Sequence, residues 1–549
     1  MPKITINKNT LMKLVGKKFT DKELEEKIPM LGVDMEYIEG NDLIVEIFPN
    51  RPDLLSDQGF ARAFKSFIGK KTGLIKYKIK DSKEKVIVDS KLSNIRPYTA
   101  CAIIKTIKFN DENITEIMQL QEKLHITFCR NRKKASIGIY PLDKIKFPIY
   151  YKALEPEKIK FQPLDEKKEL TAIEILNKTP KGKFYKHLLE DFKLYPCFVD
   201  SNNNFMSLIP VINSELTGKV TEKTKNVFIE VSGIDLNTIN QCLNIIVTTL
   251  VDMGGEIYSL QIQYKNQKIK TPNLSPSELK IDLNYINKIL GLKINENDTE
   301  KYLAKMGLGY KNKKALIPGY RTDIMHQIDI AEEIAIAYGY NNFEHSIPNI
   351  ATAAEEDKIE KFKSLIKQIL IGLNFTEINT FHLSNKKSQC NKMNHDFDLI
   401  ELENALTEDY NALRAWLIPS LIETLHRNKH NEYPQNIFTM GYSFSKDNKF
   451  ETNIKEELKL AVCLASADVD YTKIRQVLNS LFLSLNLTPI YKESNCPSFI
   501  AGRIAEVLIK GKSIATLGEI SPLVLTQWNL ETPVAAFELN LSVLFEILH

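Results

Sequence analysis

The stretch AEVLIKGKSIATLGEI (505–520) contains two runs rich in Val, Ile and Leu, separated by a short turn with glycine. This pattern predicts two antiparallel strands. LKLAVCLA (458–465) and AAFELNL (535–541) favour further strands, and IEKFKSLIKQILIGL (359–373) has the spacing of an amphipathic helix. We therefore expect residues 347–549 to form an antiparallel sheet with helices packed on it.

The chain of 549 residues is too long for one hydrophobic core, which predicts an α+β multidomain protein. We expect an N-terminal α/β domain over residues 1–88. An α+β domain should follow over residues 89–270, where VFIEV (227–231) is typical of a strand and LTAIEIL (170–176) of a helix. Residues 271–346 predict two or three helices and a short hairpin, and hence a small winged-helix-like domain.

Residues 75–80 alternate apolar side chains with lysines, a pattern that predicts a strand with one lysine face. Such a face has two interpretations. It is either an edge strand that lysines protect from aggregation, or a surface that contacts phosphate groups.

The composition excludes several classes of protein. No run of about 18 apolar residues and no apolar signal segment are found, so we expect a cytoplasmic protein without a membrane partner. Seven cysteines lie scattered without a CxxC pair, which argues against a zinc ribbon and against a disulfide framework. A net charge of +4 leaves a nucleic-acid partner open.

Four acidic residues are concentrated within GYRTDIMHQIDIAEEIAIAYGYNNF (319–343). If this segment is helical, Asp329, Glu332 and Glu333 share one face, and Asp323 can reach them from the preceding turn. Carboxylates that converge repel one another unless a cation neutralises them, and an all-oxygen set suits Mg²⁺. The same spacing also fits a helix start, where acidic side chains cap backbone N–H groups.

The whole phrase 319–343 resembles the magnesium motif of phenylalanyl-tRNA synthetase β subunits, and all four acidic positions match. EIFPNRPDLLSDQGFARAF (46–64) resembles the N-terminal signature of that family. ASIGIYPLDKIKFP (135–148) and SLIPVINSELTGKVTEKT (207–224) are similar to its archaeal and eukaryotic branch. The resemblance covers nearly the full length of the chain.

The resemblance implies a subunit of phenylalanine–tRNA ligase that works with an α subunit in an (αβ)₂ heterotetramer on tRNA(Phe). ATP would bind to the α subunit, and Mg²⁺ would be shared with it. Residues 347–549 would keep a class II synthetase-like fold without its active site, because neither Arg414 nor Arg503 stands in the expected context and no glycine-rich arginine segment follows Ala536. The chain alone would be inactive.

In this family, a separate pocket of the β subunit hydrolyses mischarged Tyr-tRNA(Phe). The resemblance places Phe198, Ser207, Glu230 and Ser232 at its positions. Archaeal relatives usually read Asp-Val-Thr-Gly-Thr-Asp where this chain reads Glu-Val-Ser-Gly-Ile-Asp (230–235), so both lining positions differ. Whether editing is active therefore stays open.

Two clusters of basic residues are candidates for tRNA contact, although charge runs are usually solvated. They are Lys70, Lys71, Lys76, Lys78 and Lys80, and Arg130, Arg132, Lys133 and Lys134. Two other functions remain as alternatives: a non-catalytic RNA-binding scaffold, and a free-standing hydrolase of mischarged tRNA.

Overall fold

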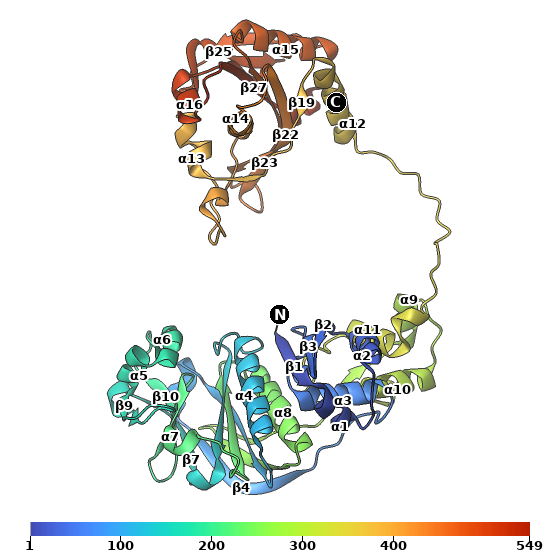
Figure 1. Ribbon diagram of the computed structural model, residues 1–549, viewed down its shortest axis with the longest axis vertical. Helices are drawn as coiled ribbons and strands as arrows, with labels where there is room; N and C mark the ends of the chain where they lie inside the picture. Colours follow the sequence, from blue (N-terminus) through green and yellow to red (C-terminus); the bar gives the residue numbers. More distant parts are fainter. Residues whose placement is uncertain (1, 549) are drawn as a thin grey trace. The chain divides into compact units, whose positions relative to one another are not determined.

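The computed structural model describes residues 2–548, whose contacts separate into two compact units, residues 1–347 and 348–549 (Figure 1). Both units combine helices with sheets, so the α+β multidomain class is confirmed. The finer division into four domains stays a prediction. No helix within residues 2–548 is long and apolar enough to cross a membrane.

The N-terminal part of the first unit is a small antiparallel sheet covered by helices. Its strands follow the order β1-β3-β2. They are β1 (Lys3–Asn7), β2 (Asp34–Glu39) and β3 (Asp42–Glu46), and the helices are α1 (Lys8–Val15), α2 (Asp21–Lys27) and α3 (Asp57–Phe67). The helix α3 begins after Ser56, whose side chain accepts a hydrogen bond from the backbone N–H of Gly59.

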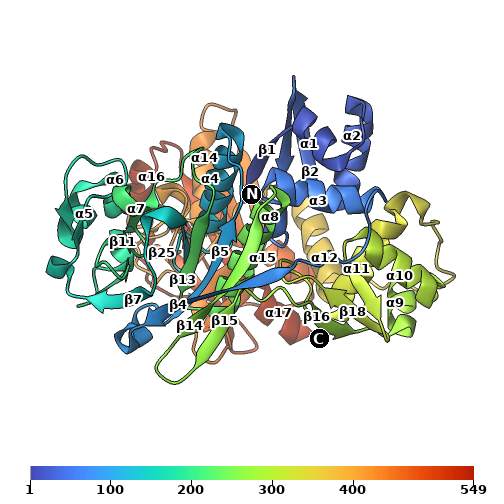
Figure 2. The same ribbon diagram turned by 90° about the horizontal axis from the view of Figure 1, so that it is seen from below.

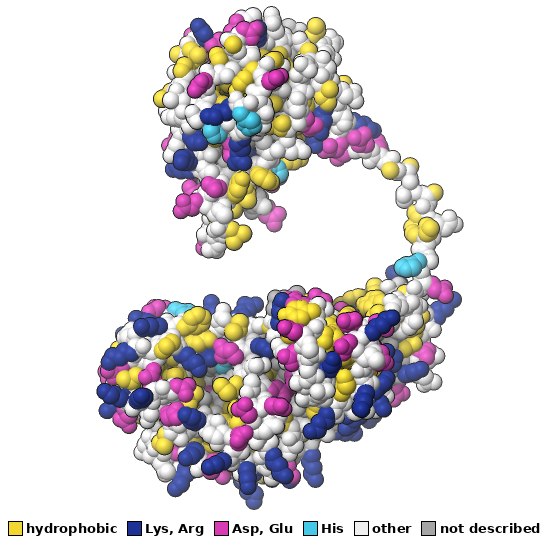
Figure 3. All heavy atoms as spheres, viewed as in Figure 1, with side chains coloured by type: hydrophobic (Ala, Val, Ile, Leu, Met, Phe, Trp, Pro, Cys, Tyr) yellow, Lys and Arg dark blue, Asp and Glu magenta, His cyan; other side chains and the backbone are white. Residues whose placement is uncertain are grey.

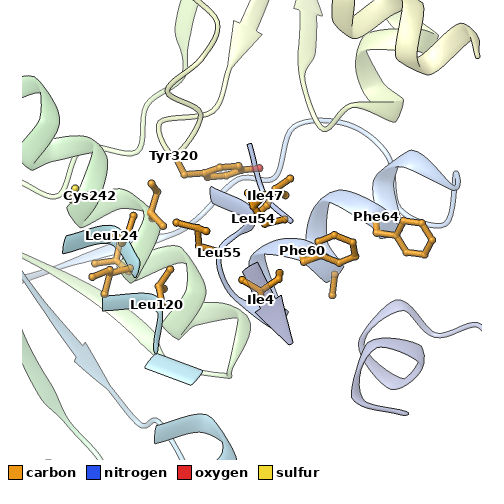
Figure 4. Close-up of a cluster of buried hydrophobic side chains, with 14 of the residues drawn as sticks. Ile4, Ile47, Leu54, Leu55, Phe60, Phe64, Leu120, Leu124, Cys242 and Tyr320 are labelled. Atoms are coloured by element: carbon orange, nitrogen blue, oxygen red, sulfur yellow. The ribbon is translucent and has the colours of Figure 1, made fainter. Parts of the chain in front are cut away.

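One hydrophobic cluster joins this part to the rest of the first unit (Figure 4). The cluster contains, among others, Ile4, Phe60, Leu124, Cys242 and Tyr320. Because these side chains come from segments far apart in the sequence and are buried together, the first unit holds together as one body.

A ten-stranded sheet dominates the first unit, in the order β12-β11-β10-β7-β4-β14-β5-β13-β6, with β15 paired to β14. The strands are β4 (Ile79–Val88), β5 (Tyr98–Lys105), β6 (Ala135–Pro141), β7 (Ile149–Leu154), β10 (Tyr195–Val199), β11 (Phe205–Leu208), β12 (Ile212–Asn213), β13 (Val227–Gly233), β14 (Glu256–Gln263) and β15 (Lys268–Thr271). A separate two-stranded pair consists of β8 (Lys160–Phe161) and β9 (Leu170–Thr171). The accompanying helices are α4 (Asp111–Ile126), α5 (Ala172–Lys178), α6 (Pro180–Tyr185), α7 (Glu215–Gly218) and α8 (Leu236–Asp252).

The two faces of this sheet differ in character. Helices α4 and α8 cover one face, and Val227, Ile229 and Val231 of β13 belong to the hydrophobic cluster beneath them (Figure 2). Because side chains alternate along a strand, Glu230 and Ser232 point to the opposite face. Both are fully buried, so β13 places two polar groups inside the protein.

The predicted strand over residues 75–80 is wrong. Residues 74–78 have no regular structure, and β4 begins only at Ile79. This strand pairs with β14 and β7 inside the large sheet, so it is not an edge strand. The alternation instead reflects an extended segment anchored by Tyr77, whose hydroxyl lies within hydrogen-bond distance of Arg62 and Asp252.

The first unit ends in a small helical part with a three-stranded sheet in the order β16-β18-β17. Its elements are β16 (Ser277–Lys280), α9 (Leu283–Leu290), α10 (Glu296–Lys305), β17 (Gly309–Lys311), β18 (Lys314–Ile317) and α11 (Gln327–Tyr338). The helix expected after Asp323 is therefore present as α11.

The second unit is built on a seven-stranded sheet, β19-β22-β23-β27-β26-β25-β24, in which only the pair of β19 and β22 is parallel. Its strands are β19 (Thr376–Glu377), β22 (Gln435–Lys446), β23 (Ile454–Ala465), β24 (Ile490–Glu493), β25 (Phe499–Ile509), β26 (Lys512–Ile520) and β27 (Val534–Asn540), and β20 (Leu383–Ser384) pairs separately with β21 (Ala412–Leu413). The helices are α12 (Lys358–Gly372), α13 (Lys386–Gln389), α14 (Ile418–Arg427), α15 (Tyr471–Ser484), α16 (Pro522–Gln527) and α17 (Leu541–Leu548).

The predicted hairpin over residues 505–520 is confirmed as β25 and β26. Lys510 and Gly511 form its turn with φ values of 48° and 81°, the left-handed conformation that two-residue hairpin turns require. Helices α12, α15 and α17 pack on one face of the sheet, and α14 and α16 on the other.

Candidate functional site

A cavity of about 320 Å³ lies where the two ends of the ten-stranded sheet approach each other. Strands β6 and β12 are the first and last strands of the sheet, yet Tyr140 of β6 and Asn213 of β12 are in hydrogen-bond contact. The sheet therefore curls until its ends meet. Residues that line the cavity include Gln121, Ser136, Ile137, Leu208, Asn213 and Glu230.

A cluster of buried polar side chains closes one end of this cavity. The Tyr140 hydroxyl donates to Ser207 Oγ at 2.9 Å, and it lies 3.2 Å from Asn213 Oδ1 and 3.3 Å from Glu230 Oε1. The Ser232 hydroxyl donates to Glu230 Oε2 at 3.0 Å. Each carboxyl oxygen of Glu230 thus lies within hydrogen-bond distance of a hydroxyl group, Oε1 of Tyr140 and Oε2 of Ser232.

Gly138 makes room for this cluster. It stands opposite Glu230 in the pairing of β6 with β13. A Cβ atom at Gly138 would lie 2.5 Å from Glu230 Oε1 and 2.5 Å from the Tyr140 hydroxyl oxygen. Any larger residue would push both groups out of place, so the glycine is required for the Glu230 side chain to reach across its strand to the cavity.

Glu230 is held mainly in its neutral form. Burial is the largest cause and raises the pKa of Glu230 to about 8, while hydrogen bonds with Ser232 and Tyr140 and the charge of Arg96 act in the opposite direction. Burial likewise raises the pKa of Tyr140 well above its usual value. Near pH 7 this end of the cavity therefore carries a carboxylic acid rather than a carboxylate.

The structure brings together three of the four predicted editing residues: Ser207, Glu230 and Ser232. Phe198 stands opposite Ser207 in the pairing of β10 with β11, but its ring stacks on that of Tyr151 at a centroid distance of 4.5 Å within a hydrophobic core. Of the four residues, Glu230 lines the cavity, whereas Phe198, Ser207 and Ser232 are not among its lining residues.

Sequence reasoning missed three residues of the site: Gly138, Tyr140 and Asn213. The alternation within IGIY (137–140) places Gly138 and Tyr140 on one face of β6, which is a weak signal. No sequence pattern connects Tyr140 to Asn213, because only the curl of the sheet brings their strands together.

The interpretation of Arg132 as a tRNA contact is wrong, because its side chain is buried. Its Nη1 atom donates to the carbonyl oxygens of Pro210 and Val211, each at 3.0 Å, and Nη2 donates to Glu122 at 3.2 Å. Its guanidinium also lies over the Tyr185 ring. The residue supports the wall of the cavity and does not face solvent.

The other basic candidates lie at the surface. Lys80 is paired with Glu256 at 2.7 Å, which leaves it less available to a phosphate group. Figure 3 shows Lys and Arg side chains gathered along the lower rim of the first unit in that view. The candidates that are exposed without an ion pair among residues 2–548 are Lys70, Lys71, Lys76, Lys78, Arg130 and Lys133, and Lys134 is partly exposed.

The acidic set at α11 is organised around a buried arginine. Arg321 binds Asp323 through two hydrogen bonds of 2.8 and 2.7 Å, and Glu333 through two of 3.1 and 2.7 Å. Burial opposes the charged form of Asp323, but Arg321 and Arg51 outweigh it and hold the pKa of Asp323 below its usual value. These two carboxylates are thus neutralised by the protein itself.

Asp329 and Glu332 differ from that pair. Asp329 accepts hydrogen bonds from the backbone N–H groups of Met325 and His326, so it also caps the start of α11. Glu332 is exposed and has no hydrogen bond or ion pair among residues 2–548; burial and three nearby carboxylates raise its pKa. Both line a hollow of about 300 Å³.

The acidic residues do not form a complete metal site. Within residues 2–548, no group of three or more His, Cys, Asp or Glu side chains is arranged to hold a metal ion. The physical reason is the arginine: Arg321 occupies the oxygen atoms of Asp323 and Glu333. Asp329 and Glu332 form no hydrogen bond or ion pair with Arg321 within residues 2–548.

Comparisons with known proteins agree with this architecture. Residues 344–541 match the family described as phenylalanyl tRNA synthetase beta chain CLM domain, and residues 279–340 match the tRNA synthetase B5 domain. These matches and the two α+β units define a chain of the aminoacyl-tRNA synthetase class.

Full-length relatives make the assignment specific. The chain is 40% identical to the phenylalanine–tRNA ligase beta subunit of Thermococcus sibiricus, over 100% of this chain and 99% of that protein. It is 40% identical to that of Pyrococcus horikoshii, over 99% and 100%. An N-terminal fragment of the Pyrococcus horikoshii subunit has a solved structure that covers 61% of this chain and 99% of its own, with 41% identity and a TM-score of 0.59. The chain belongs to the phenylalanine–tRNA ligase β-subunit family.

Proposed function

We propose that the chain acts as the β subunit of a heterotetrameric (αβ)₂ ligase that attaches phenylalanine to tRNA(Phe) with ATP and Mg²⁺. The observation that carries this proposal is the 40% identity to ligase β subunits over the full length of both chains. The chain contributes the interface with the α subunit and part of the tRNA-binding surface. The α subunit supplies the ATP and phenylalanine sites.

Co-expression with the α chain of the same organism tests the proposal. The purified complex should charge tRNA(Phe) with phenylalanine, each chain alone should leave it uncharged, and native mass spectrometry should give two copies of each chain. Failure of the chains to co-purify would favour the RNA-binding scaffold instead. Release of amino acid from mischarged tRNA by the isolated chain would favour the free-standing hydrolase.

The acidic set supports a shared cation site. Asp329 and Glu332 would bind a divalent cation at the hollow beside α11, and the α subunit would supply the remaining ligands. A bound cation would neutralise the carboxylates whose repulsion raises the pKa of Glu332. Arg321 meanwhile fixes Asp323 and Glu333 behind them.

The cavity between β6 and β12 corresponds in this proposal to the editing pocket that the resemblance implies. Support comes from Glu230, which lines the cavity, and from Ser207 and Ser232, which belong to the same buried hydrogen-bonded cluster. Its volume of about 320 Å³ lies within the range of pockets that accept small organic groups.

A further inference from the structure

We propose that the main chain of Ile139, on the open edge of β6, binds the α-amino acid part of an aminoacyl ester. Its N–H group would donate to the ester carbonyl oxygen, and its C=O group would accept from the α-ammonium group. The inference rests on the proposed editing pocket and names a contact by which that pocket holds its ligand.

Strand β6 has one paired edge and one open edge. It pairs with β13, and no other strand pairs with it within residues 2–548. In an antiparallel ladder, residues whose N–H and C=O groups bond to the partner strand alternate with residues whose groups point away from it. The register of β6 on β13 runs from Ala135 to Pro141 without a shift, so this alternation is unbroken.

Ile137 shows which residues of β6 direct their main chain away from β13. Its N–H donates to Nε2 of His125 at 2.9 Å, and its C=O accepts from the side-chain amide of Gln121 at 2.8 Å. Both partners come from α4. Ile139, two residues further along the strand, has the same orientation, and so has Pro141, whose missing N–H suits an open edge.

The main chain of Ile139 is not capped in this way. Within residues 2–548, neither its N–H nor its C=O group has a hydrogen-bond partner from another element on the open side of β6. Ile139 is only 6% exposed, and it lines the cavity together with apolar side chains of α4 such as Ile117 and Met118. Buried main-chain groups are nearly always paired, so this donor and acceptor require a partner that enters the cavity.

The open edge accommodates one residue and no more. On one side His125 and Gln121 occupy the main chain of Ile137, and on the other side Pro141 has no N–H. Burial lowers the pKa of His125 to about 4, so near pH 7 this side chain is neutral and stays an acceptor. A peptide strand needs a row of free N–H and C=O groups, whereas an α-amino acid ester offers one carbonyl and one ammonium group.

The class of ligand is therefore an α-amino acid ester with a free amino group. Apolar residues such as Ile114 and Leu208 also line the cavity, and a hydrogen bond in such surroundings is stronger than in water. The carbonyl and ammonium groups are the same in every aminoacyl ester. The contact with Ile139 thus holds the ligand, and the other lining residues decide which side chain is accepted.

Ile139→Pro in the assembled αβ enzyme tests the inference, because proline has no N–H. Proline is tolerated on the open side of an edge strand, and Pro141 already occupies such a position in β6. Ile139→Val is the matched control, since it keeps the N–H.

The proline ring also fills space, so a second variant carries the α-hydroxy acid analogue of isoleucine at position 139. This analogue replaces the N–H by an ester oxygen and keeps the side chain. Thermal unfolding of each complex verifies that the variants fold.

The first measurement is binding of tyrosinamide and of tyramine, which lacks the carbonyl group, with the synthetic site of the α subunit saturated by a sulfamoyl analogue of phenylalanyl adenylate. The unmodified enzyme and Ile139→Val should bind tyrosinamide about tenfold more tightly than tyramine. Ile139→Pro and the α-hydroxy acid variant should bind the two compounds within about twofold of each other.

The second measurement is release of tyrosine from preformed Tyr-tRNA(Phe). It should be at least about fivefold slower in Ile139→Pro and in the α-hydroxy acid variant than in the unmodified complex, and it should stay unchanged in Ile139→Val.

The inference is overturned if the unmodified enzyme binds both compounds equally, or if the α-hydroxy acid variant keeps the preference for tyrosinamide. An equal loss in Ile139→Val would assign the effect to the side chain and would also overturn it. Absence of binding by both compounds would overturn the pocket itself. A failure of the proposed ligase function would be visible separately, as a complex that does not charge tRNA(Phe).

Discussion

Glu230 and Glu332 both have a raised pKa, but their surroundings give them different roles. Glu230 is fully buried in β13, and both of its oxygens have hydroxyl partners. Glu332 is exposed on α11, and the charges of three neighbouring carboxylates add to partial burial. Glu230 is a neutral group within a buried hydrogen-bonded cluster. Glu332 retains an unbalanced negative charge that a cation or a basic partner can neutralise.

The largest effect is expected from Arg321→Met, which removes the only buried cation hydrogen-bonded to Asp323 and Glu333 within the described residues. Two buried carboxylates are then left without compensation, and we expect a loss of about 3–5 kcal/mol in the free energy of unfolding. Chemical denaturation of the purified chain measures it. Arg130→Met, at an exposed position, is the control and should change the free energy of unfolding little. An equal loss in the two variants would show that Arg321 does not stabilise the fold by pairing with Asp323 and Glu333.

Glu230→Gln tests the difference between Glu230 and Glu332 through the pH dependence of stability. The folded state holds the proton of Glu230 with a pKa of about 8, above its usual value of 4.5. Its contribution to stability is therefore complete below about pH 4.5 and is lost as the pH rises through about 8, at up to about 1.4 kcal/mol per pH unit. Glu230→Gln should remove this slope.

Melting temperatures between about pH 5 and pH 9 measure the difference between the two proteins. Asp57 and Glu116, whose burial raises their pKa values to about 6 and about 7, give slopes of the same sign in both and cancel in the comparison. Parallel pH profiles of the two proteins would show that Glu230 is charged in the folded state.

Glu332→Gln removes one charge from the acidic set without removing a hydrogen bond. We expect unchanged or slightly higher stability of the isolated chain, by less than about 1 kcal/mol, because repulsion is relieved. The assembled enzyme should bind Mn²⁺, used as a spectroscopic substitute for Mg²⁺, at least tenfold more weakly. Glu300→Gln on α10, outside the acidic set, serves as the control, and equal Mn²⁺ affinities in all three complexes would refute the cation site.

The smallest effect is expected at the exposed lysines. Replacing Lys70, Lys71, Lys76 and Lys78 by Gln should lower the slope of log affinity for tRNA(Phe) against log salt, by about 0.7–0.9 for each phosphate group that a lysine no longer neutralises. Lys80→Gln should add little, because this lysine is paired with Glu256. An unchanged slope would assign tRNA binding to another surface.

Elements that depend on local pattern could be predicted from the sequence. The hairpin of β25 and β26, the helices α11 and α12, and the shared orientation of Glu230 and Ser232 follow from periodicity and turn residues. The alternation in residues 75–80 was misleading, because an extended segment anchored at intervals gives the same pattern as a strand.

Features that depend on long-range geometry could not be predicted. Arg132 belongs to a basic run, and only the position of the Pro210 carbonyl shows that it is buried. The grouping of the four acidic residues was expected, but the pairing of Arg321 with two of them was not. Tyr140 and Asn213 are 73 positions apart and meet only because the sheet curls.

The junction between β6 and β12 has a mechanical consequence. Neighbouring strands elsewhere in this sheet are joined by backbone ladders, but these two terminal strands meet through side chains such as those of Tyr140 and Asn213. Parting them would break hydrogen bonds worth about 1 kcal/mol each and would leave every ladder intact. The two terminal strands are therefore the place at which this sheet can open while its backbone pairing stays whole.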